Sequence, residues 1–420
     1  MARLGMGGAE TGDVAGTGPD ASGIVGAATS VTSPVHGGAR AYKFDSAAGA
    51  SATILGLRTS TGSLLSNMFG PSITGYMRAY LCFGNLPTAA NVGVFGTQSI
   101  HARLTTGGKV QLWNTAAGAQ IGSDSAATIT ADGATWYRFE LSGVFNASNQ
   151  ITDCELRLDG VTVATGSGLA VGTVNQLRIG WFANPGASKI MYADDWIAND
   201  NSGASHNTWP DAGEVMVLLK PISDSAVGSG WTDDAGSGTN IWDAVTNTPP
   251  NGIADTTAST GLHQIRNASS AASSYDANLT SYTTAGIGAS DTVEALLPIV
   301  STGAPVATGA KTGSVGIASN PVIANLALQA NTNQFWTGTA AGTYPTGWKW
   351  SIGTLTELPS VTLATSPVGR ITITGGTASR IAMTCALMMY VGYTPAAVAT
   401  TYITRNPFPW LQAVNRASVY

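Results

Sequence analysis

Short runs of alternating apolar and polar residues are the feature of this sequence that most constrains its fold. They recur from the start of the chain to about residue 220, and Gly, Asn and Asp separate them. A period of two is typical of β-strands with one buried face. No stretch in this half shows the 3.6-residue period of a capped helix, so at most short helical connectors are expected. The runs cover residues 39–44, 72–83, 109–114, 136–141, 153–158 and 176–181.

The strongest turn signal is Asp159-Gly160, which separates the run 153–158 from the run 161–164. An Asp-Gly pair favours the two-residue hairpin turn, because both of its residues tolerate positive φ. Many short strands at this spacing, with no helices between them, predict an all-β fold. The specific prediction is two antiparallel β-sandwich domains in tandem, of jelly-roll or concanavalin-like type.

The length of 420 residues exceeds what one hydrophobic core usually serves, so two domains are expected. The first is predicted over residues 1–221. Its apolar run Val215–Leu219 is either the last strand of this domain or a strap to the next. The second sandwich is predicted over 222–395, and residues 396–420 form a tail rich in Pro and aromatic residues.

The second predicted domain begins with an irregular Ser-, Asp- and Gly-rich segment that runs to about residue 290 and is too long for an ordinary loop. Within it, Ser269 to Tyr282 is the only stretch in which a short helix is allowed. Strands are expected again beyond it. The last of them lacks charges over most of its length, so it should lie in the middle of a sheet or be covered on both faces. These strands span residues 292–300, 314–317, 369–374 and 380–391.

Charge is scarce in this chain. Charged residues make up 10% of the sequence, hydrophobic residues 44%, and the net charge is −5. A solitary enzyme normally carries more charge, so the composition favours a component of a larger assembly. Lys and Arg form no run, which argues against nucleic acid and anionic membranes as partners. The start of the chain lacks the apolar core of a signal peptide, and no run reaches the ~18 apolar residues of a membrane span.

The sequence carries no recognisable catalytic motif. Its four histidines do not sit beside a nucleophile, and no phosphate-binding glycine loop occurs among its 52 glycines. Glu140 and Glu155 are a conceivable glycosidase pair, but both lie in strand-like alternation where a solvated face is the default. Cys82, Cys154 and Cys385 lie far apart, without metal-ligand spacing, and are interpreted as small buried hydrophobes. The prediction is therefore a protein that is not an enzyme and has no cofactor beyond a structural calcium ion considered below.

Three short segments stand out by their order and spacing: Arg3–Gly12, Gly37–Tyr42, and Tyr192–Asp200 followed by Trp209-Pro210. Together they resemble segments of bacteriophage virion proteins with concanavalin-like sandwich domains. Similar chains continue through an apolar strand to Lys220-Pro221, then to Gly230-Trp231 and Pro249-Pro250, and end near Tyr390–Pro395. The resemblance implies a virion location and a structural component of the head, tail or fibre, and fold-level analogy does not choose among these.

Three carboxylates are candidate metal ligands. Glu10 lies near the first strand and Asp194-Asp195 near the end of the first domain, and the first and last strands of a jelly roll are often neighbours. Carbohydrate-binding jelly rolls to which the pattern is similar use such a Glu and Asp for a structural calcium ion, with carbonyl oxygens completing the shell. The alternative is that the two adjacent Asp residues simply mark a turn or a strand end.

Aromatic residues supply the candidate contact sites. Trp113, Trp136, Trp181 and Trp196 are candidates for a sugar-stacking platform, although core packing is the more common fate of a strand Trp. Trp336, Trp348 and Trp350 lie among Gly and Thr, so exposure at loop tips is expected, with a glycan or a partner chain as the contact. Phe408, Trp410 and Tyr420 on the tail are predicted to dock onto a neighbouring chain; the alternative is a tail folded back on its own domain.

Two functions follow. The first is a non-enzymatic virion structural protein, either a capsid decoration or a tail- or fibre-associated component. It would dock on a particle lattice with other virion proteins, form homo-oligomers and expose lectin-like domains. The second is an adhesin that binds host surface polysaccharide through an exposed Trp with nearby Asp or Asn.

Overall fold

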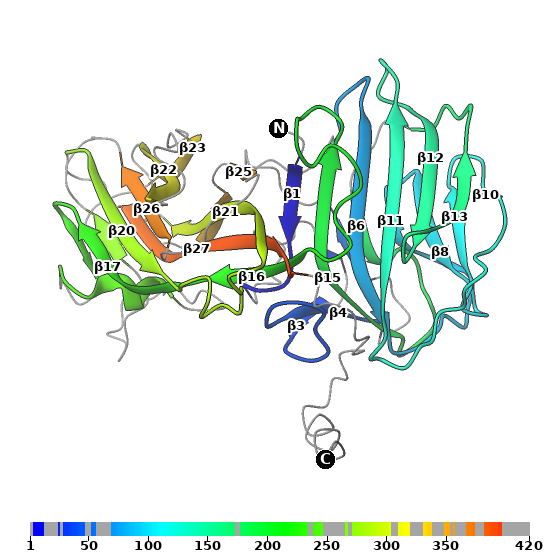
Figure 1. Cartoon of the computed structure of the whole chain (residues 1–420), viewed down its shortest axis with the longest axis horizontal. Helices are drawn as coiled ribbons and strands as arrows, with labels where there is room; N and C mark the ends of the chain where they lie inside the picture. The colour runs from blue at the N-terminus through cyan, green and yellow to red at the C-terminus, as the bar shows by residue number, and fades with distance from the viewer. Residues whose placement is uncertain are drawn as a thin grey trace, which may run out of the picture.

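The computed structural model has an all-β, antiparallel architecture (Figure 1). Every strand pairing among the described residues is antiparallel, and the only helical element there is the short 3₁₀ helix η1 (Ile241–Val245). The predicted fold class is thus confirmed. Among the residues that the structure describes, no helix is long and apolar enough to cross a membrane. The structure describes residues 3–11, 24–25, 28–46, 52–55, 69–172, 177–233, 238–246, 265–267, 271–303, 310–319, 331–337, 348–352, 356–357, 367–373 and 382–396.

Two sheets form the first sandwich in the described part of the chain. One has the order β13-β12-β11-β6-β15-β4-β3, with β1 also paired to β15, and the other has the order β10-β9-β8-β7-β14-β5-β2. The strands of the first sheet are β1 (Arg3–Gly7), β3 (Ala28–Val31), β4 (Ala41–Asp45), β6 (Thr74–Phe83), β11 (Trp136–Phe145), β12 (Ile151–Leu158), β13 (Val161–Gly166) and β15 (Ile190–Asp200). Those of the second are β2 (Ile24–Val25), β5 (Ala52–Leu55), β7 (Val92–Gly96), β8 (Ile100–Leu104), β9 (Val110–Asn114), β10 (Ala119–Ile121) and β14 (Arg178–Trp181).

Alternation along β6 decides which side chains reach the core. Met77, Leu81 and Phe83 belong to the buried cluster between the two sheets, whereas Arg78 and Tyr80 lie on the opposite, outer face. The predicted hairpin is confirmed: Asp159 and Gly160 join β12 to β13 with φ of 52° and 80°. These are the left-handed values that a turn of this kind requires, which is why Gly is favoured there.

Two further sheets form the second sandwich in the described residues. One has the order β18-β19-β27-β21-β24, with β16 paired to β27 and β25 to β21, and the other has the order β17-β20-β26-β22-β23. The first contains β16 (Val215–Leu219), β18 (Trp231–Asp233), β19 (Ile265–Asn267), β21 (Thr292–Gly303), β24 (Trp348–Ile352), β25 (Thr356–Glu357) and β27 (Ala382–Thr394). The second contains β17 (Pro221–Val227), β20 (Ser273–Leu279), β22 (Ala310–Ser319), β23 (Asn331–Thr337) and β26 (Val368–Ile373).

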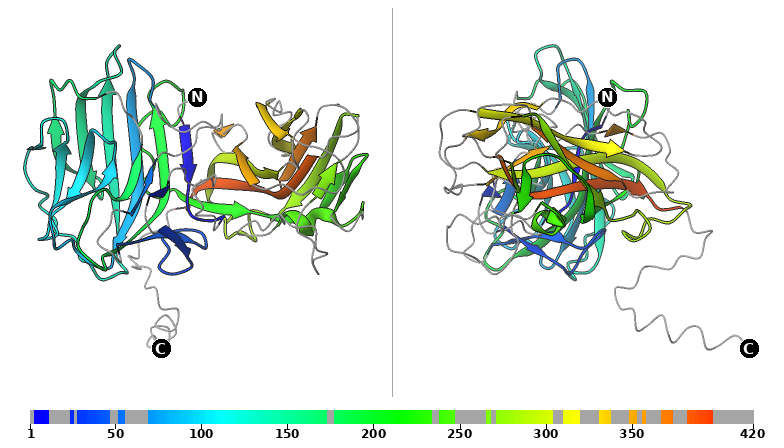
Figure 2. Two further views of the ribbon diagram at one scale, coloured as in Figure 1. Left: turned by 180° about the vertical axis from the view of Figure 1, so that it is seen from behind. Right: turned by 90° about the vertical axis from the view of Figure 1, so that its left-hand side faces the viewer.

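The last apolar strand lies in the middle of its sheet, as expected. β27 pairs with β21 along one edge and with β16 and β19 along the other. The same pairing answers the open question about Val215–Leu219, because β16 is a strand of the second sandwich rather than of the first. In Figures 1 and 2, β16 runs from the first body into the second beside β27.

The expectation of a helix between Ser269 and Tyr282 is wrong. Residues 273–279 form β20, in which Tyr275, Ala277 and Leu279 are buried. These residues alternate with a period of two, which is the strand pattern. The described parts of the segment expected to be irregular also include β17, β18 and β19. Sheet hydrogen bonds use backbone groups, so Ser- and Asp-rich sequence can also pair once a neighbouring strand is present.

The two bodies lie end to end and are joined by a buried junction (Figures 1 and 2). An apolar cluster crosses it: Met6 of β1 and Ile197 of β15 pack with Met216 of β16 and Met388 and Tyr390 of β27. Each of these side chains is at most 2% exposed. The cluster removes apolar surface of both bodies from water, which favours one fixed arrangement of the two.

A buried ion pair accompanies this cluster. Arg3 Nη1 and Nη2 lie 2.5 and 2.8 Å from the two carboxylate oxygens of Glu214, and both side chains are fully buried. Arg3 Nε also donates to Asn199 Oδ1 at 2.7 Å. Burial opposes ionisation of Glu214, but the adjacent Arg3 outweighs it and holds the pKa of Glu214 below its ordinary value.

Arg78 adds a second cationic tie at the junction. Its guanidinium donates to the backbone carbonyls of Asp195 at 3.1 Å and Glu214 at 2.7 Å, and also to that of Asp211. The side chain is completely buried. It therefore anchors the segment that precedes β16 to the outer face of the first sandwich.

We expect removal of one partner of the Arg3–Glu214 pair to cost far more than removal of both. Arg3→Met or Glu214→Gln alone leaves a buried group unpaired and should lower the free energy of unfolding by about 3–5 kcal/mol. The double variant Arg3→Met/Glu214→Gln should be clearly less destabilised than the sum of the two single variants. Chemical denaturation at pH 7 measures this cycle, and additive losses would contradict the pairing.

The same pair predicts acid sensitivity. Because the pKa of Glu214 is lowered on folding, its contribution to stability is present above the unfolded-state pKa and is lost as pH falls through the folded value. The stability difference between wild type and Glu214→Gln should therefore shrink below about pH 4.

Candidate functional site

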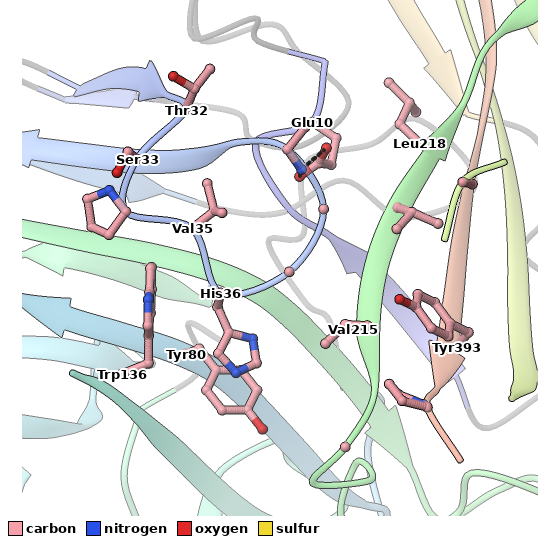
Figure 3. A pocket seen from close by; sticks show the side chains of 18 of the residues that line it. Glu10, Thr32, Ser33, Val35, His36, Tyr80, Trp136, Val215, Leu218 and Tyr393 are labelled. Carbon is pink, nitrogen blue, oxygen red and sulfur yellow. Dashed lines mark hydrogen bonds between the residues drawn. The ribbon is translucent and has the colours of Figure 1, made fainter. Parts of the chain in front are cut away.

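A cleft of about 1300 Å³ opens beside the junction. Its walls come from segments far apart in the sequence: the loop 32–39 between β3 and β4, the outer face of β6 and β11, and β16 and β27 of the second sandwich. Figure 3 shows His36, Tyr80 and Trp136 together, with Val215 and Tyr393 across from them. The cleft therefore exists only while the two bodies keep their relative position.

Glu10 holds one end of the loop 32–39. Its Oε1 and Oε2 accept the backbone amide of Ala39 at 3.0 and 2.9 Å, and Oε1 also accepts that of Arg40 at 3.0 Å. Gly38 passes the carboxylate with φ of 56°, and a side chain at this position would collide with Glu10. Only glycine combines this backbone conformation with so close an approach.

Asp194 and Asp195 hold the middle of the same loop from β15. The register of β15 against β6 shifts between Asp194 and Ile197, and Asp195 has φ of 45°. Such a bulge re-aims side chains, so two consecutive carboxylates can both be buried. Asp194 Oδ2 accepts the amides of His36 at 3.0 Å and Gly37 at 3.3 Å.

Asp195 links the loop to the second sandwich. Its Oδ2 lies 2.6 Å from His36 Nδ1, and its Oδ1 accepts the backbone amide of Met216 in β16 at 2.8 Å. One buried carboxylate thus fixes both the histidine in the cleft and the strand that forms the facing wall. Sequence reasoning grouped Glu10, Asp194 and Asp195 correctly in space, because β1 pairs with β15.

The calcium ion predicted for these three carboxylates stays a prediction, and their geometry does not fit it well. Burial, followed by the charges of Asp195 and Glu10, raises the pKa of Asp194 well above its ordinary value, a crowding that a cation would relieve. The oxygens, however, accept backbone amides or contact His36, whereas calcium needs six to eight oxygen ligands. No group of three or more His, Cys, Asp or Glu suited to a metal occurs among the described residues.

An aromatic wall lines the first-sandwich side of the cleft. The His36 ring stacks on Tyr80, with centroids 3.5 Å apart and planes at 14°, and Trp136 stands edge-on to His36 at 5.8 Å. Tyr80 is 8% exposed and its hydroxyl donates to the carbonyl of Ala212. His36 and Trp136 are half-buried. The tryptophan is therefore the large ring of this wall that remains open to the cleft.

The four tryptophans proposed as a sugar platform lie in different surroundings. Trp181 and Trp196 are core residues, 0% and 2% exposed. Trp113 is half-buried, with the Arg103 guanidinium 3.8 Å from its ring centroid, and only Trp136 lines the cleft. Sequence reasoning did not single out His36 or Tyr80, because nothing local indicates that a loop histidine lies on a strand tyrosine 44 positions away.

The other predicted contact residues lie elsewhere. Trp336 is in β23, and Trp348 and Trp350 are in β24, so the expectation that these residues stand at loop tips is wrong. Their role in contacts stays a prediction. Phe408, Trp410 and Tyr420 lie outside the described residues, as does His263. Cys82 and Cys154 are buried as expected.

The conceivable glycosidase pair is held in separate ion pairs. Glu140 Oε2 lies 3.2 Å from Arg138 Nε, and Glu155 Oε1 lies 2.7 Å from Arg157 Nε. Burial raises the pKa of Glu140, while it is outweighed at Glu155, where the hydrogen bonds from Arg157 and Thr162 lower the pKa. Neither carboxylate lines the cleft.

No protein-family model and no curated protein matches this sequence. Among solved structures, it is similar to the binding domain of Paraclostridial Mosquitocidal Protein 1, with 9% identity, a TM-score of 0.34, and coverage of 66% of this chain and 64% of that one, just under two thirds. It is also similar to domain 4 of an arabinanase from Geobacillus stearothermophilus, with 14% identity, a TM-score of 0.30 and coverage of 47% and 92%.

A third similar structure is a carbohydrate esterase from the Shiga toxin-encoding bacteriophage phi24B, with 14% identity, a TM-score of 0.32, and coverage of 47% of this chain and 97% of that one. Likenesses with TM-scores this low carry no argument about the function of this chain.

Glu10→Gln should loosen the loop 32–39. A glutamine offers one acceptor oxygen where the carboxylate has two, and its NH₂ group would face a backbone donor, at a cost of about 1–3 kcal/mol. Amide hydrogen exchange at Ala39 and Arg40 should become faster, and the half-exposed Glu155→Gln serves as the control that leaves these amides unchanged. Unchanged protection in Glu10→Gln would contradict the account.

The calcium prediction has its own test. A rise in the melting temperature of the wild-type protein on addition of calcium would support the metal site.

Proposed function

We propose that this chain is a non-enzymatic structural component of a bacteriophage particle, a capsid decoration or a tail- or fibre-associated protein. It docks on the particle lattice with other virion proteins and exposes its lectin-like sandwich. A virion location and homo-oligomer formation are parts of the same proposal.

The observation that supports it most is where the segments resembling virion proteins meet. β1, which lies within Arg3–Gly12, pairs with β15, which contains the segment Tyr192–Asp200. Glu10 bonds the loop Gly37–Tyr42, and the hydroxyl of Tyr390 donates to the carbonyl of Gly8 at 3.3 Å. Segments up to 382 positions apart in sequence therefore build one junction. The motifs specify a fixed two-body shape, which suits a protein that repeats on a lattice.

Two observations support the absence of catalysis in the proposal. The acidic residues that most resemble a catalytic pair are engaged by arginines, as described above. The carboxylate of the cleft, Glu10, is occupied by backbone amides. A general acid or base needs access to its substrate, which these contacts deny.

A second candidate function is a glycan-binding adhesin, and the cleft favours it. An open tryptophan beside a stacked histidine and tyrosine is a surface on which the apolar face of a sugar ring packs. The two functions are compatible, since a virion protein can also contact the host surface.

The virion proposal predicts association in solution. The purified full chain should form oligomers or co-sediment with assembled particles, as measured by analytical ultracentrifugation. Phe408→Ala, Trp410→Ala and Tyr420→Ala should weaken that association, because the tail aromatics are its predicted docking contacts. Val161→Ala is the matched control, since Val161 is the most exposed large apolar residue described, at 67%. Monodisperse monomers with no affinity for any particle would contradict the proposal.

A further inference from the structure

We propose that the cleft between the sandwiches binds an uncharged oligosaccharide, with Trp136 as the stacking platform. This inference rests on the second function above and names its site and ligand class. It places the glycan contact at the junction rather than at Trp348 and Trp350.

The lining charge selects a neutral ligand. Glu10 is the only Asp, Glu, Lys or Arg among the described residues that line the cleft, and its oxygens face the amides of Ala39 and Arg40. Acidic sugars, phosphates and nucleic acids are recognised by arginine or lysine, and the described lining contains neither. A neutral ligand does not need a contact with arginine or lysine.

The chemistry of the walls suits a sugar. Thr32 and Ser33 bring exposed hydroxyl groups, and Gly133 and Ala134 bring a backbone turn beside Trp136. Val215 and Leu218 form a half-buried apolar wall opposite. A sugar ring combines hydroxyl edges with apolar C–H faces, so it can use both kinds of surface at once. The volume of about 1300 Å³ exceeds the ~300–1000 Å³ of ordinary small-molecule sites, which indicates several linked sugar units.

The aromatic wall is fixed before any ligand arrives. Asp195 holds the His36 ring through Nδ1, and Tyr80 is held between His36 and the carbonyl of Ala212. Trp136 begins β11 and pairs there with Cys82 of β6, so its backbone is part of the sheet. A preorganised platform loses little conformational freedom on binding, which favours affinity.

The test is a glycan array followed by titration of the full chain with the neutral oligosaccharide that it retains best. Trp136→Ala should raise the dissociation constant about tenfold or more, and His36→Ala should also raise it. Trp113→Ala is the matched control: it removes a half-buried tryptophan of the same sandwich that does not line the cleft, and affinity should not change. The thermal midpoint of each variant checks that it folds. In wild type, the Trp136 indole N–H resonance should shift on titration.

Each other outcome overturns the inference. If Trp348→Ala or Trp350→Ala abolishes binding and Trp136→Ala does not, the glycan-binding function stands but its site is not the cleft. Retention of acidic glycans alone would refute the neutral class. If no glycan is retained, both the inference and the glycan-binding function fail. Protection of Trp136 by a protein of the particle, without any glycan, would assign the cleft to a protein partner instead.

Discussion

The relative position of the two sandwiches depends on the buried contact between Arg3 and Glu214. A bidentate pair with no exposure is satisfied in one geometry, because guanidinium and carboxylate must be coplanar and close. Its net contribution to stability is limited by the cost of burying both charges, so its main effect is to specify the arrangement. The apolar cluster around Met216 and Tyr390 supplies the hydrophobic free energy that the pair does not.

The cleft inherits its shape from this junction. Asp195 contacts His36 on one wall and the backbone of Met216 on the other. The same bulge in β15 therefore positions both walls. The guanidinium of Arg78 donates to the backbone carbonyls of both Asp195 and Glu214. A change that frees the second sandwich would therefore also disturb the aromatic wall, although no residue of that wall had been altered.

Much of the strand pattern followed from the sequence, because period-two alternation reports directly which face is buried. β6 and β11 obeyed it, and Asp159-Gly160 marked its turn through the backbone freedom of those two residues. β20 carried the same signal in Tyr275, Ala277 and Leu279, although a short helix had been allowed in this stretch.

The site was less predictable. The proximity of Glu10 to Asp194 and Asp195 followed from the expected pairing of the first and last strands. Their role as acceptors for loop amides did not, because a sequence pattern does not show which backbone amides a carboxylate binds. The stacking of His36 on Tyr80, and the strand β16 that closes the cleft, arise from tertiary packing between distant segments. Trp136 was one candidate among four tryptophans, and only the sheet geometry separates it from the core pair Trp181 and Trp196.

Cryo-electron microscopy of particles that contain this chain tests the central claim most directly. The account predicts repeated copies in which β1, β15, β16 and β27 keep the junction described here and the cleft opens to solvent. Isolated copies that do not repeat on the particle, or a second sandwich that takes several orientations relative to the first, would contradict it.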